Sequence, residues 1–166
     1  EIENPPVRFV RSKGMKELPL PKQGRNLDDI AQFINVSDQE TLVLVLSWLS
    51  AALRGDGPYP ILVVTGEQGS SKSTFSKVIR ATIDPNDAAL RTLPRDDRDL
   101  YISASHSHML AFDNVSSVPV WLSDALCRIT SGTGFASRTL YSDADETIFD
   151  ACRPIIMNGI DDFVTR

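Results

Sequence analysis

Residues 61–74 read ILVVTGEQGSSKST, an apolar, largely β-branched run followed by a glycine-containing loop and a lysine. A short continuous apolar run of this kind predicts a strand that is covered on both faces of a parallel sheet. Residues 72–83 then have helical spacing, with Phe75, Val78, Ile79 and Thr82 on one side. A strand, a loop with glycines and a helix, in this order, predict an α/β protein that binds phosphate at the loop.

The loop differs from the usual phosphate-binding pattern at one position. That pattern is glycine, four free positions, glycine, lysine and then serine or threonine, and Ser71 stands where the second glycine is expected. Because serine is a preferred capping residue, we expect Ser71 to adopt a negative φ at the start of the helix. The missing glycine should then affect close approach of the ligand rather than loop geometry. The alternative is a chance Gly/Ser turn that contains a surface lysine.

The residues of the loop have distinct expected roles. Gly66 allows a sharp turn after the strand, and Gly69 can supply a positive φ. Lys72 is expected to bridge the β- and γ-phosphates of ATP, while the Ser73 hydroxyl holds Mg²⁺. The expected nucleotide-binding residues are Gly66, Glu67, Gln68, Gly69, Ser70, Ser71, Lys72, Ser73 and Thr74.

Asp113 and Asn114 follow a second apolar run, HMLAF, and are the next candidate site residues. A carboxylate at the end of a buried strand can hold Mg²⁺ through water or from the second shell, so Asp113 is an expected metal-site residue together with Ser73. Asn114 stands where a general base would be useful, but an amide cannot accept a proton. Either Glu67, Asp145 or Glu146 takes that role, or hydrolysis is slow.

Asn158 closes a third apolar run, RPIIMNG, at residues 153–159. Its amide can hydrogen-bond the γ-phosphate or the attacking water, which makes it a fourth candidate catalytic residue beside Lys72, Asp113 and Asn114. The alternative is that Asn158 and Gly159 form only a turn.

Strands and helices alternate along the rest of the chain, which predicts a mostly parallel α/β layer fold. A capping box of Ser37 and Glu40 should begin a buried helix. The other expected elements are helices at 28–34, 41–53 and 119–129, a helix that the cluster PRDDRD opens and that runs through Ser103, a weak strand at 89–93, strands at 108–115 and 153–159, and a hairpin at 135–149 with its turn at 142–145.

These motifs together resemble those of the superfamily III helicases and primase-helicase ATPases of phages and mobile elements, within the AAA+ class. The resemblance covers residues 61–159 and rests on GEQGSSKST, LAFDN, the hairpin and PIIMNG. It implies a P-loop NTPase fold of the AAA+/ASCE kind, a three-layer sandwich with a mostly parallel central sheet, here with an N-terminal helical extension. Asp113 would be the Walker B acid and Asn158 the sensor 1 residue.

The resemblance also implies partners. Such modules form homo-oligomeric rings, in which an arginine of one subunit completes the neighbouring site, and their hairpin contacts single-stranded DNA. Arg138, Arg153 and Arg166 are candidates for that arginine, although each can equally be a surface or local structural residue. The expected hairpin tip, residues 142–145, is acidic where a DNA-contacting tip would be basic.

Composition limits the remaining possibilities. The net charge is −5, and six of the 17 Lys and Arg residues lie in the first 25 positions. We therefore expect a basic arm or linker at 1–26, more a solvated tail than a DNA contact, and an acidic ATPase core at 27–166 that ends before its C-terminal edge is complete. No apolar run has the length of a membrane span. Cys127 and Cys152 are expected to be buried free thiols in a cytoplasmic protein.

Three functions fit this sequence. The first is a helicase-like ATPase core that hydrolyses ATP slowly and acts on DNA in phage or mobile-element replication. The second is a nucleotide-binding switch or assembly protein with little turnover. The third is a small-molecule kinase, for which the cluster PRDDRD at 94–99 is the only candidate lid.

Overall fold

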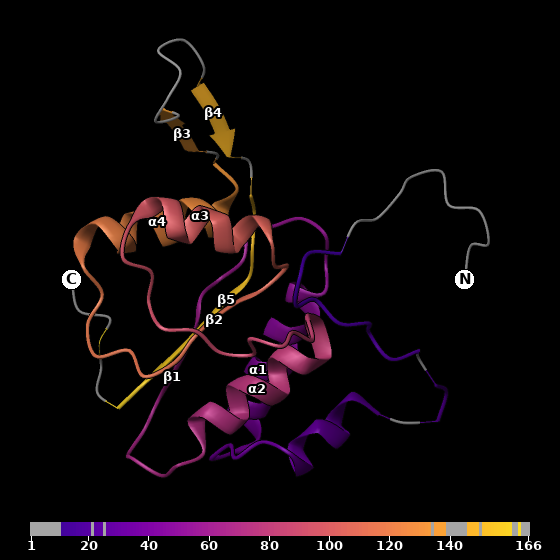
Figure 1. Cartoon of the computed structure of the whole chain (residues 1–166). Coiled ribbons are helices and arrows are strands. Elements are labelled where there is room, and N and C mark those ends of the chain that lie inside the picture. Colours follow the sequence, from indigo (N-terminus) through magenta and orange to yellow (C-terminus); the bar gives the residue numbers. More distant parts are fainter. Residues whose placement is uncertain are drawn as a thin grey trace, which may run out of the picture.

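The computed structural model describes residues 11–20, 22–24, 26–133, 151–160 and 163, and the backbone of the strands 135–138 and 146–149. It is an α/β structure with a small parallel sheet and a separate hairpin (Figure 1). The elements are η1 (Leu27–Gln32), α1 (Gln39–Ala52), β1 (Leu62–Thr65), α2 (Lys72–Ile83), α3 (Asp97–Ser105), β2 (Leu110–Phe112), α4 (Val120–Ser131), β3 (Phe135–Arg138), β4 (Glu146–Phe149) and β5 (Ile155–Gly159).

The main sheet has three parallel strands in the order β1-β5-β2. Thr65 pairs with Gly159 and Phe112 with Met157, so all three strands end at the same edge. The last strand in the sequence lies between the other two, and it brings Asn158 between the loop after β1 and the residues after β2. The predicted α/β class and parallel sheet are therefore confirmed, whereas the described sheet is smaller than the full sandwich that the resemblance implies.

Helices cover both faces of this sheet (Figure 1). Alternate residues of β5 explain why: Ile155 and Met157 pack with α3 and α4 on one face, while Ile156 packs with α1, α2 and η1 on the other. Successive side chains of a strand point to opposite faces, so one short apolar strand supplies both cores.

The helix α1 begins two residues earlier than its sequence pattern predicts, and Asp38 is its N-cap. The Asp38 carboxylate accepts a hydrogen bond from the Thr41 N–H at 2.7 Å, whereas the Ser37 hydroxyl donates to that carboxylate. The predicted Ser37 capping box is therefore wrong, because the neighbouring carboxylate is the better acceptor. The helix is also not buried all round, since Val43 and Leu44 are exposed.

The strand β1 is also less buried than its apolar sequence predicts. It is an edge strand of the described sheet, paired only with β5, and Val63 is 37% exposed. A continuous apolar run is expected for a strand covered on both faces, but it does not fix whether the strand lies at an edge.

Other expectations divide between confirmation and correction. The helix α2 has the predicted bounds, and α3, α4, β2, β5 and the pairing of β3 with β4 are found where the sequence places them. The predicted strand at 89–93 is only a single bridge between Arg91 and Phe112. Cys127 is exposed and Cys152 is half-buried, whereas the sequence predicts that both are buried.

The described part of the N-terminal arm lies against the body. The Lys16 N–H donates to the Pro85 carbonyl at 2.8 Å, and the Asp87 N–H donates to the Gly14 carbonyl at 2.9 Å. Lys16 also forms an ion pair with Asp87. Residues 12–16 are therefore a docked segment, in contrast to the solvated tail that the charge pattern suggests.

The hairpin of β3 and β4 projects away from the three layers (Figure 1). Its predicted tip at 142–145 lies outside the described residues, as do the side chains of Arg138 and Glu146 and all of Arg166. Within the part of the chain that is described, every helix is too short or too polar to cross a bilayer.

Candidate functional site

The loop between β1 and α2 has three residues with positive φ, and Gly66, at +157°, is the first of them. Gly69 has φ +84°, as its expected role requires, and Ser71 has φ +67° and ψ +20°. The negative φ predicted for Ser71 is therefore wrong, and its side chain caps no helix N–H. The left-handed conformation is unfavourable for residues with a Cβ, so serine occupies a position where the loop geometry itself favours glycine.

Lys72 is held inside the loop. Its Nζ donates to the carbonyls of Gly66 at 2.7 Å and Glu67 at 2.6 Å, and to the Ser70 hydroxyl at 3.2 Å. These bonds use all three ammonium hydrogens. The Ser70 bond is the longest, so it is the one that an incoming anion would most easily replace.

Ser73 and Asp113 meet at the carboxyl edge of the sheet. The Ser73 hydroxyl donates to Asp113 Oδ1 at 2.8 Å, although the two residues are 40 positions apart. Both side chains are half-buried. A hydroxyl and a carboxylate are oxygen ligands of the kind that Mg²⁺ prefers, so the two residues fit the metal role expected for them.

Asn158 lies between these groups and is 1% exposed. Its Oδ1 accepts the Asn114 backbone N–H at 3.1 Å, and its Nδ2 donates to the Ser76 hydroxyl at 3.0 Å. Both Asn158 and Gly159 belong to β5, so the alternative that they form only a turn is wrong. Asn114 has φ +58°, a conformation that asparagine tolerates better than most residues.

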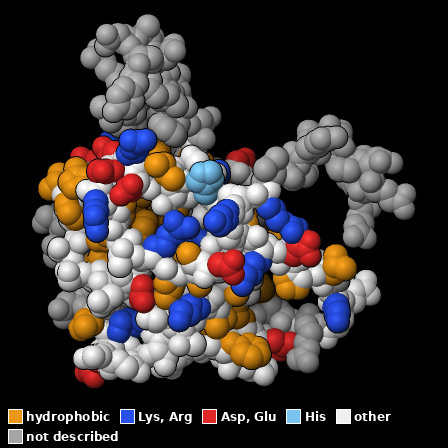
Figure 2. Space-filling model, viewed as in Figure 1, with side chains coloured by type: hydrophobic (Ala, Val, Ile, Leu, Met, Phe, Trp, Pro, Cys, Tyr) orange, Lys and Arg blue, Asp and Glu red, His pale blue; other side chains and the backbone are white. Residues whose placement is uncertain are grey.

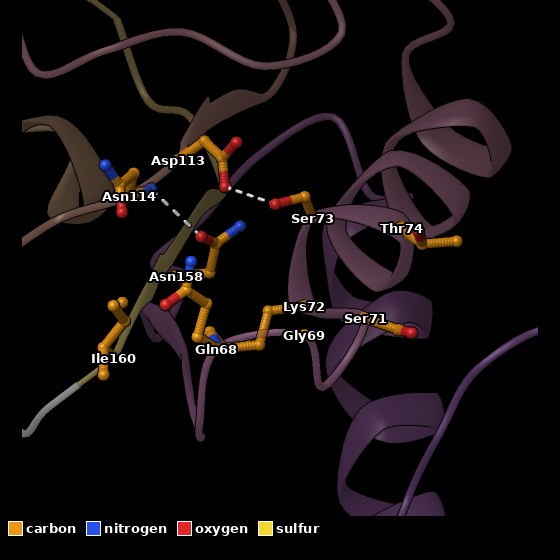
Figure 3. Close-up of a pocket in the computed structure, with 11 residues that line it drawn as sticks. Gln68, Gly69, Ser71, Lys72, Ser73, Thr74, Asp113, Asn114, Asn158 and Ile160 are labelled. Carbon is orange, nitrogen blue, oxygen red and sulfur yellow. Dashed lines mark hydrogen bonds between the residues drawn. The ribbon is translucent and has the colours of Figure 1, made fainter.

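A cavity of about 530 Å³ lies in front of these side chains. Figure 3 shows Lys72, Ser73 and Asp113 around it, with Asn158 between them. The lining residues come from the loop, the first turn of α2 and the ends of β2 and β5: Gln68, Gly69, Ser71, Lys72, Ser73, Thr74, Asp113, Asn114, Asn158, Gly159 and Ile160. The structure thus brings together most of the residues that the sequence singles out.

A second, more apolar hollow of about 470 Å³ lies beside the loop. It is bounded by the segment before α1, by α1 itself, by β1 and by α2, and it shares Gly66, Ser70 and Lys72 with the loop. A ligand held by the loop therefore has an apolar surface next to it.

Some predicted residues lie elsewhere. Arg153 precedes β5, at the edge of the sheet opposite the cavity, and donates to the carbonyls of Ala104 and Cys152. That geometry fits the local structural role rather than the trans-acting one. Glu67 is exposed, and Asp145 and the Glu146 side chain lie outside the described residues.

Ser76 is the site residue that sequence reasoning missed. It is fully buried on α2, one turn after Ser73. Its spacing from Ser73 is the only signal in the sequence, because its partner Asn158 is 82 positions away.

The fold and site define a small α/β protein with a polar cavity at the carboxyl edge of a parallel sheet. A family model described as "Actinomycete integrative conjugative element replication protein" (AICE_RepA) matches residues 27–166. Because the match covers most of the chain, the protein belongs to this family, whose name indicates a role in replication of a mobile element. No curated protein matches the chain.

Proposed function

We propose that this protein binds a nucleoside triphosphate, ATP, with Mg²⁺ in the 530 Å³ cavity, and that it is a helicase-like ATPase core in mobile-element replication. The observation that carries the proposal is the 2.8 Å contact between the Ser73 hydroxyl and Asp113 Oδ1. It joins the first turn of α2 to the residue after β2, and Lys72 lines the same cavity. A metal held there would lie beside phosphates held by the loop.

The loop and α2 offer suitable groups for the phosphates. The first N–H groups of a helix have no partner within the helix, and they carry partial positive charge. In α2 these groups belong to residues that line the cavity, Lys72, Ser73 and Thr74. Lys72 adds a full positive charge, and the neighbouring apolar hollow is suited to a nucleobase.

Mg²⁺ would complete the site chemically. It takes about six oxygen ligands and keeps several waters, so Ser73, Asp113 and phosphate oxygens are a sufficient set. When bound, the metal neutralises charge that develops on the phosphates. The residues of the chain would orient the ligand: Lys72 would contact its phosphates, and Asn158 would contact the terminal one.

Turnover by the isolated chain should be slow. Asn114 lines the cavity where a base would act, and its amide cannot take a proton from water. In the proposed assembly, an arginine from a neighbouring subunit of a ring supplies the missing positive charge, which in comparable enzymes is worth about 10³–10⁵ in rate. Single-stranded DNA is the proposed effector of that assembly.

The alternative is a nucleotide-binding switch with little turnover. The observation that favours it is the Asn158 amide, whose two polar atoms already have partners in Ser76 and Asn114. A buried amide held at both polar atoms can respond to a bound phosphate without any catalytic step.

Lys72→Ala tests nucleotide binding. The affinity for a fluorescent ATP analogue with Mg²⁺ should fall at least tenfold, because hydrogen bonds to charged groups contribute about 1.5–3 kcal/mol each. Lys77→Ala is the matched control, since Lys77 is an exposed lysine of the same helix. Equal affinity of Lys72→Ala and wild type would exclude the loop as the binding site.

The rate of phosphate release, with and without single-stranded DNA, separates the two functions. A slow rate that rises with DNA and with protein concentration supports the ATPase, and a slow rate that never rises supports the switch. Rapid hydrolysis by a monomeric sample would show that no neighbouring subunit is needed.

A further inference from the structure

Ser76 is a polar residue in an apolar place. It lies on the face of α2 that packs against the sheet, and 0% of its surface is exposed. Its hydroxyl accepts a hydrogen bond from Asn158 Nδ2 at 3.0 Å. A buried hydroxyl costs free energy unless it is hydrogen-bonded, so this bond explains how a serine is accommodated there.

The Asn158 amide has a second hydrogen bond besides the one to Ser76. On the other side of the same amide, Asn158 Oδ1 accepts the Asn114 N–H at 3.1 Å. If the amide were rotated by half a turn, its NH₂ group would face that N–H, and two donors would meet. The Asn114 N–H therefore sets which way the amide faces, and the bond to the Ser76 hydroxyl fixes the position of the amide nitrogen.

Asn158 lines the cavity, so the orientation of its amide decides which amide atom is available to a ligand. The amide nitrogen has two hydrogens, and the bond to Ser76 uses one of them. The second remains for an acceptor in the cavity, such as an oxygen of a terminal phosphate. Without the hydroxyl at 76, the amide nitrogen loses the partner that fixes its position, and only the bond from the Asn114 N–H still holds the side chain.

Hydrogen bonds therefore join α2 both to the residue that follows β2 and to the end of β5. Ser73 contacts Asp113 after β2, and Ser76, three positions later on the same helix face, contacts Asn158 in β5. Asn158 in turn holds the backbone of Asn114, which has the left-handed conformation. A ligand that shifts the first turn of α2 would therefore also shift Asn158 and Asn114.

We propose that Ser76 is a positioning residue that acts through Asn158, and that it gives the cavity its preference for a nucleoside triphosphate over a diphosphate. The inference rests on the proposed function, because it assigns the third phosphate to the Asn158 amide. Ser76 itself does not touch the ligand.

Ser76→Ala is the test, with Mg²⁺ and two probes, a non-hydrolysable ATP analogue and ADP. The affinity for the triphosphate should fall about tenfold, the size of one hydrogen bond to a charged group, while the affinity for ADP stays within about twofold. Ser107→Ala is the matched control: Ser107 is also buried, and its hydroxyl has no partner among the described residues. It should change neither affinity.

A double-mutant cycle separates positioning from a general structural effect. Asn158→Ala should lose the triphosphate preference, and adding Ser76→Ala to it should cause no further loss, because the two changes remove the same contact. The unfolding midpoint of each variant shows that the compared proteins are folded.

The outcomes distinguish failure of the Ser76 proposal from failure of the proposed nucleotide binding. Unchanged affinities in Ser76→Ala, equal losses for both nucleotides, or additive losses in the double variant would overturn the role of Ser76 and leave nucleotide binding intact. Absence of triphosphate binding by the wild-type chain would overturn the proposed function and this inference together.

Discussion

Asp84→Asn removes the charge that balances a guanidinium inside the protein. Arg80 and Asp84 lie one turn apart at the end of α2, with side chains 1% and 2% exposed and Arg80 Nη2 3.4 Å from Asp84 Oδ2. Burial lowers the pKa of Arg80, and the Asp84 carboxylate opposes that shift. The same carboxylate oxygen accepts the Met109 N–H at 3.1 Å, so the pair also connects α2 to the segment that enters β2.

The size of the effect follows from this geometry. Asparagine keeps the shape of the side chain and an acceptor for Met109, so the substitution isolates the loss of charge. Breaking a buried ion pair costs about 3–5 kcal/mol. Because Arg80 also donates to the carbonyls of Asp84 and Ala89, we expect the lower end, about 3 kcal/mol. For a domain of this size the unfolding midpoint should then fall by about 6–12 °C.

Thermal and urea unfolding, followed by circular dichroism, measure this loss. Asp87→Asn is the matched control, because Asp87 forms an ion pair with Lys16 in which both side chains are more than half exposed. Exposed pairs contribute about 0–1 kcal/mol. If Asp84→Asn lost less than about 1 kcal/mol, like the control, the argument that a buried charge requires its partner here would be refuted.

Three further predictions concern the cavity. Ser71→Gly should leave ATP-analogue binding intact and change stability by less than about 1 kcal/mol, because relief of the left-handed backbone is offset by the flexibility of glycine in the unfolded chain; a large loss of binding would mean that the serine side chain holds phosphate. Asp113→Asn should weaken nucleotide binding about tenfold or more with Mg²⁺ and little without it, since the carboxylate serves the metal; titrations that show equal losses would indicate a structural role. Gly159→Ala should destabilise the protein by about 2 kcal/mol or more in urea unfolding, because the added Cβ would overlap the Val115 carbonyl and the Phe163 ring; an unchanged midpoint would contradict that close approach.

Local sequence determined most of the elements and their order. The apolar runs at 61–65 and 153–159 and the helical spacing of 72–83 depend on neighbours in the chain, so β1, β5 and α2 are found where the pattern places them. Motif spacing also indicated that Ser73 and Asp113 belong to one site. Ser73 lies in the first turn of the helix that follows β1, and Asp113 follows β2, so both lie where parallel strands end at one edge of the sheet. The capping residue of α1 was missed by one position, since Ser37 and Asp38 compete for the same N–H groups.

Long-range packing decided the rest. The order β1-β5-β2 inserts Asn158 between the other strand ends, and no local pattern specifies which strands pair. The positive φ of Ser71 arises from the path the loop must take between β1 and α2. The bond between Ser76 and Asn158 joins residues 82 positions apart, so it exists only once α2 has packed on the sheet. The sequence by itself determined which side chains are candidates to bind phosphate and metal. The tertiary structure decided which polar atoms of these side chains already have hydrogen-bond partners within the protein, because partners far apart in the chain meet only in the folded state.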